Sequence, residues 1–500
     1  MSLLGIDLGT TGCKAVAFSE CGQALASAYQ EYATLHPHEG WNELDSTDVW
    51  RKVKTVVADV AARTKKDPIT ALSISSLGEA MTPVTRDRRI LGRSILCSDS
   101  RGDDGLAPLR TQLGQKRFYA INPNILGVNY SLPKLWWTRE NEPDLYTKAD
   151  LFLLWGDLVA FLLGGEPLTG HSLANRTLLF DIRREDWSDR LLKLAGIPRA
   201  KLAKTVPAGT IAGTVSKRVA AELGLAPNVK IVIGGHDQCC NSLGAGICRA
   251  GSAVCGIGTF ECITPTYDHI PRNTGDMLAN GLNIEHHILP GLYVSFIYNQ
   301  GGVLVKWFRD TFAAAERTKV RGKADIYDRL SAEMPADPTR LLVLPYFEMS
   351  GPPNFVADAA GAIVGLKTTT TRGEILKAIM ECETLYFVDS LNALRTLGID
   401  TSEFVATGGG AKSDVWLQIK ADVFGIPFVR PRITEATVLG AAILAGISTG
   451  VFANAAEGVS RFVARDRVFE PDPKRHAAYR EKFERYRSLL PTLHPLLKTL

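Results

Sequence analysis

The sequence has no pair of cysteines at Cys-x-x-Cys spacing, although it contains nine cysteines. That spacing is typical of zinc knuckles and thiol redox motifs, so neither kind of site is indicated. The number of cysteines is odd and they are scattered along the chain, which argues against a disulfide framework. The pattern favours a reducing compartment, and we expect a cytoplasmic protein.

A strong excess of charge of one sign is also missing. The chain has 57 basic and 53 acidic residues, which gives a net charge of +4 over 500 residues. Nucleic-acid binding usually requires a markedly basic domain or surface. We therefore expect no nucleic-acid partner.

Long apolar runs are absent too. The N-terminus shows neither the basic segment nor the apolar segment of a secretory signal. The nearest approach to a membrane span, LFLLWGDLVAFLL from Leu151, contains Asp157 and falls short of the ~18 apolar residues that a span needs. We predict a buried helix for this run and no membrane association.

What is present is the composition of a globular protein with several domains. The chain is 45% hydrophobic and 22% charged, and its 500 residues are too many for one hydrophobic core. Short β-rich runs separated by glycine turns predict an antiparallel meander near the N-terminus, over residues 2–6, 13–18 and 23–29. An amphipathic helix is predicted over residues 49–62.

The two halves of the chain share a local pattern. GIDLGTTGCKAVAF near the N-terminus and CGIGTFECITP after residue 250 both read as strand, glycine-threonine turn, strand. This weak internal similarity suggests two related halves. We place the domains at residues 1–246 and 247–500, the second ending in a charged helix.

The segment DLGTTGCK, Asp7 to Lys14, places a carboxylate at the end of a strand, before a tight glycine turn. Glycine lets a phosphate approach the backbone, Thr10 and Thr11 offer donors, and Lys14 adds positive charge. Asp7 is a candidate Mg²⁺ ligand, directly or through water. A plain β-hairpin turn is the alternative for this segment taken alone.

Two further glycine turns add to this pattern. GIGTF contains Gly258 and Thr259, and FVATGGGAKSDVWLQIKADVFG places three glycines before a helix that begins near Ser413. Such a turn lets a flat base lie against the backbone at a helix N-terminus, although capping by Ser413 alone also explains it. The Ala- and Gly-rich helix EATVLGAAILAG, from Glu435, is expected to pack closely against the triple-glycine turn.

With these residues the chain resembles the FGGY family of carbohydrate kinases, within the actin-like ATPase superfamily. The most specific match is GAIVGLKTTTTRGEILKAIMECE, residues 361–383, which satisfies the family's C-terminal signature position by position. GWNELDSTDVW and NYSLPKLWW support it, and the resemblance covers roughly residues 3–452. It implies an α/β fold of two ribonuclease-H-like domains with an interdomain cleft, the first binding sugar and the second ATP.

The resemblance also assigns roles to individual residues. In VKIVIGGHDQCCNSLGAG, residues 229–246, Asp237 falls on the family's catalytic base. We expect a strand to deliver Asp237 to the cleft floor, with Gly234 and Gly235 allowing a sharp exit; capping of the next helix is the alternative. The implied substrate-binding residues are Glu79, Tyr130, His236 and Gln238; the implied ATP-binding residues are Thr10, Thr11, Lys14, Gly258, Thr259, Gly302, Gly409, Gly410, Ala411 and Asp414; and the implied metal ligands are Asp7 and Asp237.

The implied activity is ATP-dependent phosphorylation of a primary hydroxyl of a small sugar, with Mg²⁺. Glycerol kinases carry an arginine just before the acidic residue at Glu79, whereas this chain has Gly78, so we expect more room and one strong donor fewer. A ketopentose such as xylulose is preferred by family frequency rather than by any residue. A glycerol or other short-polyol kinase, and an actin- or chaperone-type ATPase, are the alternatives, and a homodimer stays open.

Overall fold

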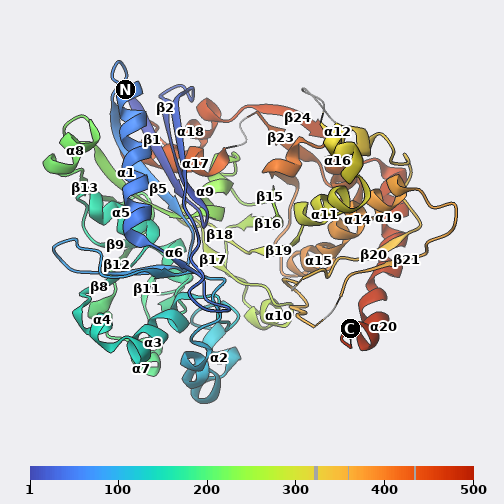
Figure 1. The fold of residues 1–500 in the computed structure, drawn as a ribbon, viewed down its shortest axis with the longest axis horizontal. Helices are drawn as coiled ribbons and strands as arrows, with labels where there is room; N and C mark the ends of the chain where they lie inside the picture. The colour runs from blue at the N-terminus through green and yellow to red at the C-terminus, as the bar shows by residue number, and fades with distance from the viewer. Residues whose placement is uncertain (320–324, 349, 359, 433–434, 500) are drawn as a thin grey trace.

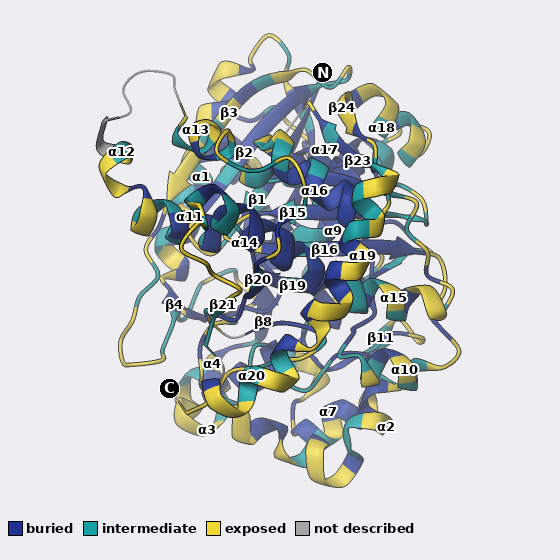
Figure 2. Ribbon diagram, turned by 90° about the vertical axis from the view of Figure 1, so that its right-hand side faces the viewer, coloured by how far each residue is buried: buried dark blue, intermediate teal, exposed yellow. Residues whose placement is uncertain are grey.

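The computed structural model describes residues 1–319, 325–348, 350–358, 360–432 and 435–499. Figure 1 shows two sheets side by side, each covered by helices, with most of the first half of the chain on the left and most of the second on the right. In Figure 2 the central strands of both sheets are buried, while the outer helices carry exposed faces. The edge strands β3, Ala24–Glu31, and β24, Arg465–Phe469, are largely exposed. No helix among the described residues is long and apolar enough to span a membrane. All nine cysteines are unpaired.

The first sheet has six strands in the order β13-β14-β5-β1-β2-β3. Strands β1, β2 and β3 form the predicted antiparallel meander, while β1, β5 and β14 run parallel. Helix α1, Ser46–Arg63, packs on this sheet through buried valines. The strand bounds are β1 Ser2–Leu8, β2 Gly12–Ser19, β3 Ala24–Glu31, β5 Ile69–Ser76, β13 Ile211–Thr214 and β14 Lys230–His236.

The second sheet has eight strands in the order β17-β18-β16-β15-β22-β23-β24, with β19 also paired to β16. It repeats the first arrangement, because β15 and β16 form an antiparallel hairpin while β15, β22 and β23 run parallel. The predicted fold of two ribonuclease-H-like units is confirmed. The bounds are β15 Ser252–Ile257, β16 Phe260–Tyr267, β17 Glu285–His286, β18 Tyr293–Val294, β19 Ile297–Gln300, β22 Glu403–Thr407, β23 Phe428–Pro431 and β24 Arg465–Phe469.

The two halves meet backbone to backbone at helices α9, Asp237–Gly244, and α17, Ala436–Ser448. A Cβ atom on Gly244 would lie 1.7 Å from the Ala436 carbonyl oxygen, and one on Gly5 of β1 would lie 1.9 Å from the Val438 carbonyl oxygen. The Ala- and Gly-rich helix therefore makes its closest contacts with α9 and β1. The expectation that it packs closely against the triple-glycine turn is wrong.

The apolar run from Leu151 is buried but is not a single helix. It forms strand β8, Leu151–Leu154, and then helix α5, Trp155–Leu163. The strand pairs with β6, Met81–Val84, so backbone pairing with a distant segment decides the conformation of the first four residues.

The last helices close the second half of the molecule. Helix α14, Arg372–Tyr386, carries the C-terminal signature, and α19, Pro473–Arg487, packs on it. Lys482 of α19 forms a buried ion pair with Glu381 of α14. The charged C-terminal segment is thus anchored in the core, and α20, Leu489–Leu497, follows it.

Candidate functional site

Two carboxylates lie at the ends of strands in the first sheet. Asp7 is near the end of β1, and Asp237 follows β14 directly as the first residue of α9. Because β1, β5 and β14 are parallel, their carboxyl ends meet at one edge, and Ser75 of β5 donates a hydrogen bond to Asp7 Oδ1 at 2.9 Å. The strand thus presents Asp237 as the sequence predicts.

Gly234 and Gly235, which precede Asp237, are needed for a different reason than the predicted sharp exit of the chain. Gly234 and Gly235 lie within β14, and neither has a positive φ. A Cβ atom on Gly234 would lie 2.0 Å from the Ile74 carbonyl oxygen, and one on Gly235 would lie 2.4 Å from Ser172 Oγ. The glycines permit close packing of neighbouring segments rather than a sharp exit of the chain.

Burial and neighbouring charge change the acidity of both carboxyls. Burial raises the pKa of Asp237 to about 7, with the charges of Asp7 and Glu79 acting in the same direction. Burial likewise raises the pKa of Asp7 to about 6, against the hydrogen bond from Ser75. A carboxyl with a pKa near neutrality can accept and release a proton under ordinary conditions.

His236 precedes Asp237 and is buried. Its Nε2 lies 3.4 Å from Asp237 Oδ1, its ring packs 5.0 Å from that of Phe296, and burial lowers its pKa well below the usual value. Nδ1 of His236 has no hydrogen-bond partner among the described residues. The side chain is therefore a neutral imidazole with one free nitrogen. The next residue after Asp237, Gln238, is only partly buried and donates its backbone N–H to the Asp237 carboxyl.

Glu79 is held in a buried ionic network by a residue that sequence reasoning missed. Arg176 donates from Nε to Glu79 Oε1 at 2.7 Å and from Nη1 to Glu285 Oε1 at 2.8 Å. Its guanidinium also lies 4.8 Å from the ring centroid of Tyr130. Glu285 belongs to β17, so the network joins the second sheet to the first half of the chain. Oε2 of Glu285 has no hydrogen-bond partner among the described residues.

Gly78 does not leave the room that the sequence suggested. A Cβ atom there would lie 2.6 Å from His236 Cδ2 and 3.0 Å from Arg176 Cγ. The space beside Glu79 is filled by these two side chains. A guanidinium is present after all, because Arg176 reaches Glu79 from another segment.

The first glycine turn is braced by residues outside it. Tyr32 Oη lies within hydrogen-bond distance of the Gly9 and Gly12 carbonyl oxygens, at 2.6 and 2.9 Å. Thr10 and Thr11 are exposed at the tip of the turn. Lys14 pairs at 2.7 Å with Glu435, which directly precedes α17 in the second half.

The other two glycine turns line one cavity of about 950 Å³ in the second half. Gly302 closes this site against the hairpin turn: its N–H donates to the Gly258 carbonyl oxygen at 2.8 Å, and a Cβ atom there would clash with that oxygen. Ala411 is buried and does not line the cavity, although its turn does. The predicted residues in the lining are Gly258, Thr259, Gly302, Gly409, Gly410 and Asp414.

The cavity wall also contains residues that the sequence analysis does not assign to ATP binding. Lys306, Asp325, Tyr327, Met380, Trp416 and Arg430 are among them. Asp414, at the start of α16, Asp414–Phe424, pairs with Arg430 at 2.6 Å and with Arg467. The wall thus combines apolar surface with charged groups.

Helix α9 links Asp237 to the wall of the cavity. Asn241, one turn after Asp237 in α9, donates to Thr407 Oγ1 at 3.2 Å. Thr407 is the last residue of β22 and directly precedes the triple-glycine turn. Helix α9 therefore connects the strand-end carboxylates to the turn that lines the cavity.

The C-terminal signature, residues 361–383, also has a structural role. Glu383 lies 3.4 Å from the buried Lys420, which also pairs with Glu261 at 2.7 Å. Glu381 is the partner of Lys482, and Met380 lines the cavity. The signature thus anchors the second half of the chain as well as contributing to the cavity wall.

Two ribonuclease-H-like units, strand-end carboxylates and glycine turns around a large cavity define a protein of the actin-like ATPase fold. Comparison with known proteins narrows this class. The model of the N-terminal domain of the FGGY family of carbohydrate kinases matches residues 2–244, and that of the C-terminal domain matches residues 254–449. The chain belongs to the FGGY family of carbohydrate kinases and uses ATP as cosubstrate.

Similar proteins include enzymes that act on different acceptors. The chain is 27% identical to a xylulose kinase from Bacillus subtilis over 489 residues, covering 97% of this chain and 96% of that protein. It is 30% identical to a glycerol kinase from Acidovorax ebreus over 502 residues, covering 95% and 96%. The crystal structure of a xylulose kinase from Rhodospirillum rubrum superposes with a TM-score of 0.88 at 26% identity, covering 99% of this chain and 100% of that one. These matches favour a carbohydrate kinase over the actin- or chaperone-type ATPase.

Proposed function

We propose that the enzyme phosphorylates a primary hydroxyl of a small uncharged sugar or polyol, with Asp237 as general base and a ketopentose such as xylulose as the first candidate acceptor. The observation that carries the proposal is the Asp237 carboxyl, presented at the end of β14 with its pKa raised to about 7. The similarity to xylulose kinases supports the choice of acceptor.

The proposed reaction is an in-line transfer. The acceptor hydroxyl donates a hydrogen bond to the Asp237 carboxylate and gives up its proton to it as the oxygen–phosphorus bond forms. The bond between the γ-phosphorus and the bridging oxygen of ATP breaks, and ADP leaves with that electron pair. His236 is neutral and lies 3.4 Å from Oδ1, so it orients the carboxylate without competing for the proton.

Asp7 and Asp237 fit the requirements of a Mg²⁺ site. Both carboxyls lie at the same edge of the sheet, and the charge of Asp7 contributes to the raised pKa of Asp237. Mg²⁺ prefers carboxylate and water oxygens and accompanies the phosphates of ATP in kinases, where it neutralises charge on the transferring group. We assign Asp7 as the main protein ligand, through water or directly, with Asp237 as its neighbour.

For ATP we propose that the cavity in the second half holds the nucleoside and that the hairpin turns hold the phosphates. Gly258, Thr259 and Gly302 lie at the cavity edge formed by the β15–β16 turn. Gly409, Gly410 and Asp414 lie on the triple-glycine side, with Ala411 supporting the turn from within. Thr10 and Thr11 are exposed donors in the equivalent turn of the first half, which suit a polyphosphate, and Lys14 follows them in β2, where it pairs with Glu435.

For the acceptor we propose a pocket beside Arg176. Glu79 and Gln238 offer directional hydrogen-bonding groups. Two buried polar atoms, Nδ1 of His236 and Oε2 of Glu285, have no hydrogen-bond partner among the described residues. Tyr130 supports the guanidinium with its ring face. Sugar hydroxyls both donate and accept, so they suit a pocket of mixed donors and acceptors.

The charge of this pocket favours a neutral acceptor. Its carboxyls are Asp7, Glu79, Asp237 and Glu285, and Arg176 is the cation that two of them share. An acceptor with its own carboxylate adds another negative charge to this set, which is unfavourable in a buried site. A ketose or alditol is therefore preferred over a sugar acid.

A screen of acceptors tests the proposal. ADP release is measured with D-xylulose, other ketoses, erythritol, glycerol and gluconate, each with and without Mg²⁺. We expect turnover with a ketose or polyol and none with gluconate. Asp237→Asn should lower kcat by about 10²–10⁴-fold, while Asp104→Asn, at an exposed position, should not. Near-native turnover of Asp237→Asn contradicts the assignment, and highest activity with glycerol favours the short-polyol alternative suggested by the glycerol kinase relative.

A further inference from the structure

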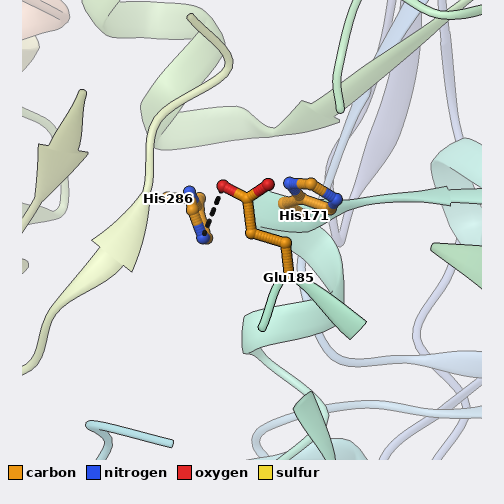
Figure 3. A group of neighbouring side chains, drawn as sticks. All are labelled: His171, Glu185 and His286. Atoms are coloured by element: carbon orange, nitrogen blue, oxygen red, sulfur yellow. Dashed lines mark ion pairs between the residues drawn. The ribbon is translucent and has the colours of Figure 1, made fainter. Parts of the chain in front are cut away.

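Away from the strand-end carboxylates, three side chains from separate segments converge on one point (Figure 3). The nitrogen or oxygen ligand atoms of His171, Glu185 and His286 all lie within 4.8 Å of one another. We propose that these three side chains bind one divalent transition-metal ion of the Zn²⁺ type. Two imidazoles and one carboxylate are a donor set that Zn²⁺ commonly uses, with water completing the coordination.

The fold brings these residues together from three elements. His171 begins α6, His171–Asn175, and His286 ends β17. Glu185 lies in the turn between β10, Phe180–Asp181, and β11, Asp186–Trp187, with φ of 54°, a left-handed value unusual for a side chain of this size. In Figure 3 the Glu185 carboxylate lies between the two imidazoles, with Oε1 3.9 Å from His286 Nε2.

The rings of the two histidines are buried and lie next to each other, with centroids 5.2 Å apart. Imidazole nitrogens are common ligands of Zn²⁺.

One hydrogen-bond partner is already in place. His286 Nε2 lies 3.1 Å from the Ile182 carbonyl oxygen. In metal sites an imidazole commonly donates one N–H to a carbonyl and binds the metal through its other nitrogen. The Ile182 carbonyl would fix the orientation of the His286 ring in this way.

Binding an ion would bring the three ligand atoms, which lie within 4.8 Å of one another, closer together. Ligand atoms about 2.0–2.1 Å from a tetrahedral ion stand roughly 3.4 Å apart. The two rings are fixed in a packed cluster that includes Phe180 and Tyr293. The Glu185 side chain is 53% exposed, so it is free to rotate inward. Rotation of this side chain would bring the carboxylate towards the two imidazoles.

A bound ion would connect the two halves of the chain. His171 and Glu185 belong to the first half, and His286 adjoins Glu285, the partner of Arg176. The His286 backbone N–H also donates to Asn175 Oδ1 at 3.1 Å. The ion would therefore fix β17 against α6 and stabilise the fold, without taking part in phosphoryl transfer.

Metal titration of the full, untagged chain tests this site. Chelator-treated protein is titrated with Zn²⁺ by calorimetry in excess Mg²⁺, which occupies oxygen-only sites, and with Co²⁺ by visible absorption. We expect one equivalent of Zn²⁺, a Co²⁺ spectrum of a tetrahedral or five-coordinate site, and a higher Tm with Zn²⁺. Glu185→Gln and His286→Gln should each weaken binding by roughly tenfold or more.

The controls separate this site from other histidines and carboxylates. His494→Gln removes a partly exposed histidine 2.9 Å from Asp358, a pair without a second imidazole, and should leave the affinity unchanged. Asp237→Asn should also leave it unchanged, which keeps this test independent of the proposed catalytic role. Because Glu185 is exposed, its variant remains informative even where a buried histidine variant fails to fold. Absence of Zn²⁺ binding, or equal binding by Glu185→Gln, overturns the proposal.

Discussion

A Cβ atom on Gly440 would lie 1.9 Å from the carbonyl oxygen of Cys240. Gly440 is in the middle of α17 and Cys240 is in α9, so the two helices touch through their backbones at this point. The same contact fixes α9, whose first residue is Asp237, against a helix from the other half of the chain. Packing at the junction and the position of the proposed base are therefore linked.

Gly440→Ala should destabilise the protein, although alanine is the better helix former. The added methyl group meets backbone atoms, which cannot rotate away, and overpacking of this kind costs about 1–3 kcal/mol. Thermal unfolding should show a lower Tm. Gly275→Ala is the matched control, because it lies in helix α10, Thr274–Ala279, and its nearest neighbour would be a side-chain atom of Asn273 at 3.1 Å. Equal Tm changes in both variants would contradict the packing argument.

Asp237 should make stability depend on pH. Its pKa in the folded protein, about 7, is above the ordinary value of 3.8, so the folded state holds this proton more tightly than the unfolded state does. The associated stability is fully present below about pH 4 and is lost as pH rises towards 7. Asp237→Asn should therefore gain Tm relative to the natural chain at pH 8 but not at pH 4.5. A Tm difference that does not vary with pH would count against the raised pKa.

The acidic limb of the pH–activity profile should report the same carboxyl. At limiting Mg-ATP, kcat/KM should rise with pH as Asp237 loses its proton, with a midpoint near 7. Glu79→Gln removes a charge that raises this pKa, so the limb should move to lower pH. Glu140→Gln changes an exposed side chain and should leave the midpoint of the acidic limb unchanged. An unchanged midpoint in Glu79→Gln would contradict the coupling of the two carboxyls.

Gly409→Ala should affect ATP binding without affecting stability. Gly409 lines the large cavity, and no atom of a described residue lies within 4 Å of an added Cβ. The methyl group would occupy space proposed for the nucleotide, so the KM for ATP should rise roughly tenfold, about 1.4 kcal/mol. Tm should stay the same. Gly410→Ala should instead lower Tm, because its Cβ would lie 2.3 Å from Ile257 Cγ2. An unchanged KM in Gly409→Ala would place the nucleotide elsewhere.

Arg176→Lys should weaken acceptor binding more than ATP binding. A lysine keeps the charge but cannot bridge Glu79 and Glu285 with two fixed N–H groups, as the guanidinium does. The KM for the sugar should rise by about tenfold or more, with little change in the KM for ATP. A loss of stability with both KM values unchanged would assign Arg176 to the fold alone.

The sequence allows much of the fold and part of the site to be predicted. The meander at the N-terminus, its repetition in the second half and the position of Asp237 follow from glycine spacing and strand periodicity, which are local signals. The helix predicted over Leu151–Leu154 is wrong. These residues form a strand because they pair with β6, a long-range contact that an apolar run does not reveal. Only the family resemblance, and not the residue pattern alone, selects Asp237 as the base.

Arg176 could not be selected from the sequence for the same physical reason. It lies in no recognisable motif, and its partners Glu79 and Glu285 are 97 and 109 positions away along the chain. Lys14 was identified from its position beside a glycine turn, but its pairing with Glu435 depends on how α17 docks across the halves. Contacts between distant segments of the chain can be identified only in the folded structure, because local sequence patterns do not reveal them.

The crowding around Gly78 limits how this pocket can change during evolution. With His236 Cδ2 2.6 Å from any Cβ at that position, an arginine cannot be added there while His236 and Arg176 keep their places. An arginine at position 78 would therefore have to come together with a change at His236 or Arg176, so the route by which a guanidinium reaches Glu79 is tied to the identity of two other residues.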